Sequence, residues 1–178
     1  MAIRLRRRLQ KFGRDESAAT AVEFALLVTP LITLILASLQ LSIIFFAGQA
    51  LQTVAVSSAR QLMTGQAQLA GDNAAQYKAN VVCPNVKILF ACTDLMVDVQ
   101  SSNSYATINT ASPTITYDGS GNVTNSWSYH PGNPGDIVIL RIMYNWPVVA
   151  APLMVGIPDQ PNGNKLLVAT SVFKAEPY

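Results

Sequence analysis

The sequence has little charge, one histidine and two cysteines in 178 residues. Only 12% of its residues are charged, whereas a soluble domain carries about 25%. Half of the residues are hydrophobic, so the composition excludes a disordered chain. The length allows one domain of ordinary size. The scarcity of charge therefore favours a chain in which one segment avoids water.

Positive charge is especially scarce beyond the N-terminus. Six of the 12 basic residues lie within the first 14 positions, and from Phe24 onward seven acidic residues outnumber six basic ones. A protein that binds nucleic acid carries its positive charge on the folded surface that touches phosphate. We therefore expect no nucleic-acid partner.

The combinations of residues that catalytic and metal sites need are also missing from the sequence. His130 stands alone in a loop rich in proline and glycine, and no Gly-x-Ser-x-Gly motif accompanies it. Asp94 and Asp98 would lie about 13 Å apart along an extended strand, too far for a pair of acid–base carboxylates. A zinc site would have to recruit carboxylates. We expect no metal, no cofactor and no enzymatic activity; a membrane-tethered enzyme is the third of the functions considered.

One long segment has no charge at all. Residues 24–59 contain no charged side chain, and the part from Phe24 to Ala47 is almost continuously apolar; about 20 such residues cross a bilayer. Because basic residues precede this run, residues 1–18 are expected to be a cytoplasmic leader. A signal peptide cleaved near residues 48–50 is the alternative, but its apolar core would span only about 7–15 residues.

The apolar run continues into an amphipathic helix. Apolar residues recur every three or four positions from Leu51 to Leu62, and Gly65 provides a stop. We predict a helix over residues 19–64, with a transmembrane segment at about 24–47 that contains Pro30. The outer half of this helix should pack its apolar stripe on one face of a sheet.

Residues 65–178 are expected to form an extracytoplasmic α+β domain. A polar helix is predicted over residues 66–82, with Asp72 as its N-cap. Strands and a hairpin turn are predicted from alternating, β-branched and aromatic residues and from turn residues. The predicted strands are 95–100, 105–110, 114–117, 123–129, 136–146 and 165–174, and the turn is 118–122. The fold class is therefore α+β, a long N-terminal helix packed on a small antiparallel sheet.

The two cysteines, Cys83 and Cys92, lie in this outer domain. The compartment outside the cytoplasmic membrane is oxidising, and two cysteines can form only one bridge. We predict a disulfide between them, which would stabilise a small core by about 2.5–3 kcal/mol.

The string Ser17–Leu27, in which Glu23 adjoins Phe24, resembles the N-terminus of the TadE-like proteins. These are pilin-like subunits of the tight adherence (Tad) branch of the type IV pilus superfamily. Further similar segments are Leu95–Val99, Gly135–Val138, Tyr144–Pro147 and Glu176–Tyr178. The resemblance implies that a prepilin peptidase cuts after Ala18, where the family usually has glycine. Ala19 would then be the new N-terminus and Glu23 the fifth residue.

The resemblance also implies a function, that of a minor pilin-like subunit (pseudopilin) in the assembly of a Tad-type (Flp) pilus used in adhesion. The implied location is the bacterial inner membrane, with the N-terminus in the cytoplasm and the C-terminal domain in the periplasm. The implied partners are other pilin-like subunits, the inner-membrane Tad machinery and a prepilin peptidase. Glu23, followed by Phe24, would pair with the free α-amino group of a neighbouring subunit during assembly.

Two questions stay open at this level. Small and polar residues on one face of the membrane segment could contact other helices, or their hydroxyls could bond to their own backbone. These residues are Ala25, Thr29, Thr33, Ala37 and Gln40. The alternative function is an unprocessed single-pass membrane protein whose periplasmic β domain binds a peptide, a glycan or another envelope component.

Overall fold

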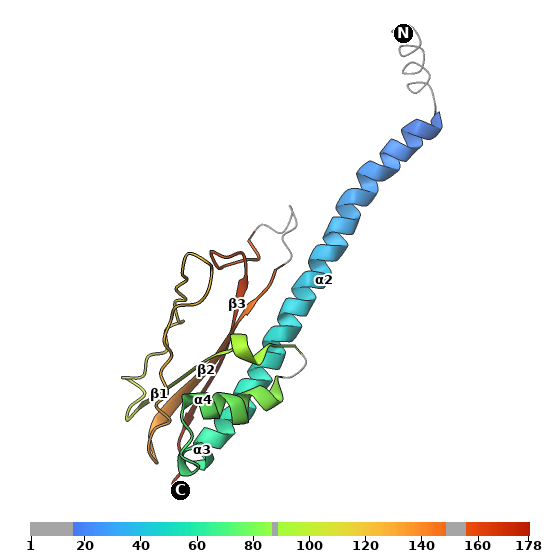
Figure 1. Cartoon of the computed structure of the whole chain (residues 1–178). Coiled ribbons are helices and arrows are strands. Elements are labelled where there is room, and N and C mark those ends of the chain that lie inside the picture. Colours follow the sequence, from blue (N-terminus) through green and yellow to red (C-terminus); the bar gives the residue numbers. More distant parts are fainter. Residues whose placement is uncertain (1–15, 87–88, 149–155) are drawn as a thin grey trace. The chain divides into compact units, whose positions relative to one another are not determined.

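The computed structural model of the protein describes residues 16–86, 89–148 and 156–178. Its longest element is the helix α2 (Glu16–Met63), which contains Pro30 (Figure 1). The chain divides into two compact units at residues 42 and 43, and α2 contributes to both. The predicted long N-terminal helix is confirmed, whereas the part of the predicted leader that covers residues 1–15 lies outside the described residues.

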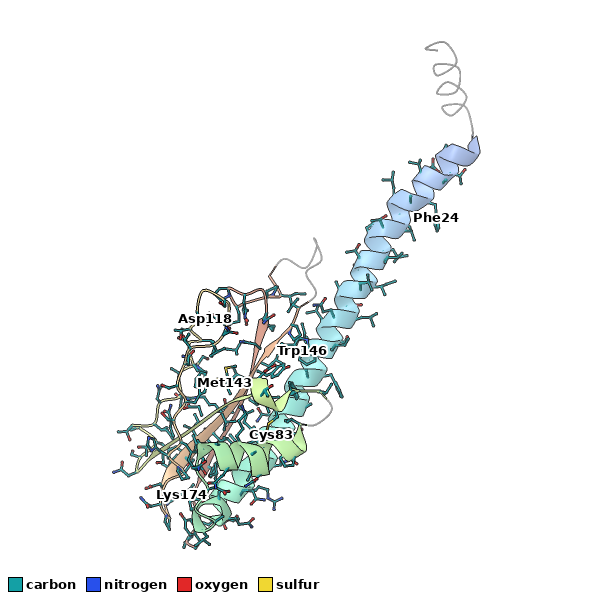
Figure 2. All side chains as sticks on the ribbon, in the orientation of Figure 1. Phe24, Cys83, Asp118, Met143, Trp146 and Lys174 are labelled. Carbon is teal, nitrogen blue, oxygen red and sulfur yellow. A yellow bond between two sulfur atoms is a disulfide. The ribbon has the colours of Figure 1, made fainter. Side chains whose placement is uncertain are left out.

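In the first unit, apolar side chains of α2 are open to the surroundings. Phe24 is 67% exposed and Leu27 is 73% exposed, and the large side chains that follow are similar up to Leu41; Figure 2 shows Phe24 on this part of α2. Within the described residues, α2 is the one helix that is long and apolar enough to cross a membrane. Such a surface is more stable in lipid than in water, because removing apolar area from water is favourable.

The second unit contains a three-stranded antiparallel sheet in the order β1 (Met96–Ser102), β2 (Ile137–Trp146), β3 (Lys165–Lys174) (Figure 1). The strands predicted at 95–100, 136–146 and 165–174 are therefore confirmed. The most apolar of them, β2, lies at the centre, because a central strand is covered on both faces.

One face of the sheet packs on the second half of α2. Alternate residues of β2 enter the same core cluster as the apolar stripe of the helix, as predicted. The helix residues of this cluster are Ile44, Ala47, Leu51, Val54, Ala55, Ala59 and Leu62. Each fully buried large apolar side chain contributes about 1.5–3 kcal/mol. The stripe begins at Ile44, so the last turn of the long apolar run already belongs to the core of the second unit.

The polar helix predicted over 66–82 is divided. It forms α3 (Gln66–Leu69) and α4 (Ala74–Tyr77), separated by Gly71 with a positive φ of 69°. The prediction of Asp72 as the N-cap is wrong. The cap is Asn73, whose side-chain oxygen accepts from the backbone N–H of Gln76 at 3.0 Å, while the Gln76 side chain accepts from the Asn73 backbone.

Short irregular turns connect α4 to the sheet. A π-helical turn, η1 (Lys78–Val82), is followed by two 3₁₀ turns, η2 (Cys83–Asn85) and η3 (Cys92–Asp94). The two 3₁₀ turns hold the two cysteines, and η3 leads directly into β1. This connection carries the chain from the helical side of the core to the edge of the sheet.

The other face of the sheet is covered by residues 103–129, here called the cover segment. The strands predicted at 105–110, 114–117 and 123–129 are wrong, since this fully described segment forms only isolated bridges, Tyr117 with Val123 and Tyr129 with Val99. Its backbone groups bond to side chains instead: Asn125 Oδ1 accepts from the Thr116 N–H at 2.7 Å. The predicted turn at 118–122 is confirmed by a 2.9 Å bond from the Asp118 N–H to the Asn122 carbonyl.

A buried ion pair joins the sheet to the cover segment. Arg141 of β2 lies opposite Asp98 of β1 in the strand register, and its guanidinium donates to the Asp98 carboxylate. The same carboxylate accepts from the backbone N–H of Ser128, and Arg141 donates to the Asn109 carbonyl. Arg141 breaks the apolar run of the strand in the sequence, and together with Asp98 it anchors the cover segment at two points.

The end of α2 and the edge of β3 are held by chain segments that are distant in sequence. Gly65 ends the helix with a φ of 73°, and the ring of Tyr178 lies directly over its Cα; the Glu176 N–H donates to the Met63 carbonyl at 2.8 Å. The side chain of Gln52 reaches the free edge of β3 and bonds to both backbone groups of Thr170. These contacts hold the helix at the C-terminal end and in the middle of its buried stripe.

Candidate functional site

The predicted processing and assembly residues lie close together at the start of α2. Ala18, Ala19, Glu23 and Phe24 all fall in the first turns of this helix. Ala19 and Glu23 are four residues apart and therefore share one face of the helix. Within the described part of the chain, the Glu23 carboxylate has no hydrogen-bond or ion-pair partner. A carboxylate beside an apolar segment is costly to bury unpaired.

Hydroxyl groups farther along α2 are already satisfied by their own helix. Thr29 Oγ1 donates to the Ala25 carbonyl at 2.7 Å, and Thr33 Oγ1 donates to the Thr29 carbonyl at 2.7 Å. These bonds agree with the second of the two possibilities for this face, in which the hydroxyl groups bond to the backbone of their own helix. The face keeps its small residues, which let helices approach closely, but these threonine hydroxyl protons are not free for bonds between helices.

Cys83 and Cys92 form a disulfide, with their Cα atoms 5.5 Å apart, in agreement with the predicted pairing. The closed loop carries Phe90 into the core, where its ring lies 5.1 Å from that of Tyr144 and 6.0 Å from that of Trp146. Because both contacts are edge-to-face, the ring geometry is the favourable one. The disulfide therefore holds an aromatic cluster against the C-terminal end of β2.

The two groups considered for catalysis lie apart and have structural contacts. His130 is exposed, and its backbone N–H donates to the Val99 carbonyl at 2.9 Å. Asp98 is buried in the ion pair with Arg141, while Asp94 lies outside the sheet in η3 and accepts from the Thr93 hydroxyl at 2.8 Å. Neither aspartate is placed to exchange a proton with the other.

A polar pocket that sequence reasoning missed lies where β2 ends and β1 and β3 begin. It has a volume of about 540 Å³, and Figure 2 shows Trp146 and Asp118 toward this end of the sheet and Lys174 toward the other. Five segments of chain line it, and we call it the asparagine pocket. Its polar and aromatic lining side chains are Lys78, Thr93, Asp94, Asn122, Asn125, Trp127, Asn145, Asn162 and Asn164. Its sequence signal is the concentration of asparagine at turns and strand ends.

Two of its asparagines are held by the protein in different ways. Both polar atoms of the Asn125 amide are used, because Oδ1 accepts from Thr116 and Nδ2 donates to the Thr114 carbonyl at 3.0 Å. The Tyr117 hydroxyl lies 3.2 Å from Asn145 Oδ1 and 2.9 Å from Gln160 Oε1, and its one proton is donated to one of these two acceptors at a time. Asn145 Nδ2 and the whole Asn164 amide have no partner among the described residues, so they are free to meet a ligand.

The charged groups of the pocket balance each other. Lys78 Nζ donates to the Thr93 carbonyl at 3.1 Å, and Asp94 lies beside Thr93. Burial lowers the pKa of Lys78 from its ordinary value, and the nearby Asp94 carboxylate opposes this shift. The pocket therefore presents one positive and one negative side chain, with amides and an indole between them.

The described chain thus combines one apolar helix with a small α+β unit, an arrangement compatible with a single-pass membrane protein. The family model described as TadE-like protein matches residues 18–60, which include Ala18, Ala19, Glu23 and Phe24. The resemblance inferred from the N-terminal string is therefore confirmed for this segment. No curated protein and no solved structure matches the chain.

Proposed function

We propose that the protein is a minor pilin-like subunit that takes part in the assembly of a Tad-type pilus. The observation that carries this proposal is the TadE-like match over residues 18–60, which covers the whole apolar part of α2. The unpaired carboxylate of Glu23 at the start of that segment supports it. The role is structural, and we assign it no catalytic step.

The proposed membrane topology puts residues 1–18 in the cytoplasm and the second unit in the periplasm. The basic residues before the apolar run support this orientation. We assign the lipid-spanning part to residues 24–43, because Ile44 is already buried in the core of the second unit. At about 1.5 Å per residue this segment is roughly 30 Å long, the thickness of the hydrocarbon layer of a bilayer.

The proposed assembly step uses the free N-terminus. Cleavage after Ala18 would create an α-amino group on Ala19, one helical turn from Glu23. Within one chain these groups sit on the same helix, whereas in an assembly the carboxylate of one subunit can bond to the amino group of its neighbour. Since an unpaired carboxylate near lipid is costly, the pair forms only when the axial offset of the two helices is correct. Pairing would therefore fix the register of adjacent subunits.

Mass spectrometry of the N-terminus tests the processing step. The full chain is expressed with and without a prepilin peptidase and with partner pilin-like subunits. We expect a chain that begins at Ala19 only when the peptidase is present, and faster cleavage of Ala18→Gly, which restores the usual family residue. A chain that retains Met1 in both proteins, and that fails to co-purify with pilin-like subunits, would contradict the proposal. It would favour the unprocessed single-pass protein with a binding domain.

A further inference from the structure

We propose that the asparagine pocket binds a neutral oligosaccharide. This binding function is additional to pilus assembly and uses only residues of the second unit. The pocket volume of about 540 Å³ lies within the range of roughly 300–1,000 Å³ that is usual for small-ligand sites. The charge of the lining, the hydrogen bonding of its amides and its indole ring indicate the class of ligand.

The charge of the lining excludes ionic ligands. Lys78 and Asp94 are its two charged side chains, they have opposite signs, and both contact Thr93. A site for phosphate or for another anion gathers several positively charged donors, and a site for a cation gathers carboxylates. Neither pattern is present in this pocket, so the ligand it fits is polar and uncharged.

The amides of the lining match hydroxyl groups. A primary amide presents a donor and an acceptor side by side, and each sugar hydroxyl can accept and donate one hydrogen bond. Asn145 Nδ2 and the Asn164 amide are without partners in the described part of the chain, and Asn145 Oδ1 competes with Gln160 Oε1 for the proton of the Tyr117 hydroxyl. The Asn164 backbone is fixed by a 3.2 Å bond from its N–H to Asn162 Oδ1. The Asn164 backbone is thus fixed in advance, which reduces the entropy cost of ordering this segment when a ligand binds.

Trp127 supplies the apolar surface. The side chain is half-buried and packs against the small cluster of Met96, Ile115 and Met143, so its ring is held by the core. A fixed indole with one open side can cover the apolar C–H face of a sugar ring. Lysine and asparagine side chains alone would bind a sugar weakly, because hydroxyl groups exchange bonds with water at little net gain.

The position of Trp127 also favours an oligosaccharide over a single sugar. A second hollow, with a volume of about 390 Å³, lies on the cover segment and is also lined by Trp127. Its lining is again polar and includes Gln100, Ser126 and Ser128. Trp127 therefore lines both polar hollows, and a chain of sugars that passes this residue can reach both.

Isothermal titration calorimetry of the full chain tests the proposal. The protein is held in lipid nanodiscs free of glycoside detergents, because maltoside and glucoside headgroups are themselves sugars. The probes are chitotetraose, cellotetraose and maltotetraose as neutral oligosaccharides, with tetragalacturonate as an anionic probe of the same length and a neutral tetrapeptide of glycine and serine. We expect saturable binding of at least one neutral oligosaccharide, and weaker binding of the other two probes. In a Trp146→Phe protein, the fluorescence of Trp127 should change with the same dissociation constant.

Variants assign the binding to the pocket. Asn164→Ala and Asn145→Ala should each weaken binding about three- to tenfold, the effect of one lost hydrogen bond. Asn103→Ala is the matched control, since Asn103 is exposed on the cover segment and lies in neither hollow. Absence of saturable binding up to about 10 mM, preference for the anionic probe or the peptide, or equal affinity in the pocket variants would each overturn the proposal. None of these results would bear on processing after Ala18.

Discussion

Arg141 and Asp98 form an ion pair of 3.0 Å in which the two side chains are only 4% and 5% exposed. The pair lies on the face of the sheet that the cover segment occupies, and the Asp98 carboxylate also accepts from Gln100 and from the Ser128 backbone. Because the Asp98 carboxylate accepts these further hydrogen bonds, the ion pair is part of a hydrogen-bonded network and not an isolated contact. Loss of one partner would leave the other charged and buried.

We predict that Asp98→Ala destabilises the protein by about 3–5 kcal/mol, since it leaves the Arg141 guanidinium unpaired in the interior. Urea unfolding followed by tryptophan fluorescence measures this. The control is the pair of Lys165 and Asp159, which is shorter at 2.7 Å but has side chains 34% and 40% exposed. Lys165→Ala should cost less than about 1 kcal/mol. Equal losses in the two variants would contradict a special role for the buried pair.

A second prediction concerns the edge of β3. Gln52 Nε2 donates to the Thr170 carbonyl at 3.0 Å, and Gln52 Oε1 accepts from the Thr170 N–H at 3.2 Å. Gln52→Leu removes both bonds and should cost about 1–3 kcal/mol. It should also speed hydrogen exchange at the Thr170 amide. Gln49→Leu is the control, because Gln49 is exposed on the same helix and its side chain makes no hydrogen bond within the described residues. Unchanged exchange at Thr170 in the Gln52 variant would show that the edge is held in another way.

The end of α2 gives a third prediction. A Cβ at Gly65 would lie 2.2 Å from the ring of Tyr178, in addition to the strain of a φ of 73°. Gly71 has a similar φ of 69°, but a Cβ there would meet open space. Gly71→Ala should therefore cost about 1 kcal/mol from backbone strain alone, and Gly65→Ala should cost clearly more. Addition of Tyr178→Ala to Gly65→Ala should recover the difference. If the two single variants have equal melting temperatures, the ring contact contributes nothing.

The disulfide gives a fourth prediction. The double variant Cys83→Ser, Cys92→Ser should lose about 2.5–3 kcal/mol of stability, because the unfolded chain gains the freedom of the opened loop. The loop also holds Phe90 against the sheet, so limited proteolysis should cut near it first. Melting temperature and protease half-life are the measurements, with reductant treatment of the unmodified protein as a parallel test. Free thiols in the exported protein would contradict a structural bridge.

The fifth prediction tests the assembly role of Glu23. Glu23→Gln removes the charge with little change in size, so membrane insertion should be retained or improved. Co-purification with partner pilin-like subunits and pilus formation should both fall if the carboxylate pairs with a neighbouring amino group. Ser42→Ala is a control within the same helix, since it removes a polar group that lies far from the N-terminus and bonds to the Ser38 carbonyl of its own helix. Normal assembly of the Glu23 variant would contradict the pairing.

The strands that the sequence predicts correctly are those in which the pattern of apolar side chains is enough to determine the strand. The residues of β2 are apolar on both faces, and β3 alternates, so burial favours one arrangement of each. The cover segment has similar β-branched and aromatic residues, yet its backbone bonds to side chains such as Asn125. Bonds between side chains and backbone within this segment therefore override its intrinsic preference for β strands.

The same distinction explains which parts of the site could be predicted. The segment around Glu23 is contiguous in sequence, so its pattern can be recognised without the fold. The asparagine pocket assembles from five separate segments, and Asn145 and Asn164 become neighbours only through the register of β2 with β3. Likewise, the sequence shows Arg141 only as a charged residue that interrupts an apolar strand. The register of β1 with β2 is needed to show that it lies opposite Asp98.

The anchoring of the cover segment has a kinetic consequence. The partners of the ion pair lie on β1 and β2, so the anchor does not exist until these strands have paired across the long connection between Ser102 and Ile137. The connection between β2 and β3 is shorter, and shorter loops close at a lower entropy cost. The β2–β3 hairpin should therefore form early, and the cover segment should fold last and open first. One wall of the asparagine pocket belongs to this late-folding segment, so a bound ligand would slow its opening and appear as protection of the amides from residue 122 to residue 127.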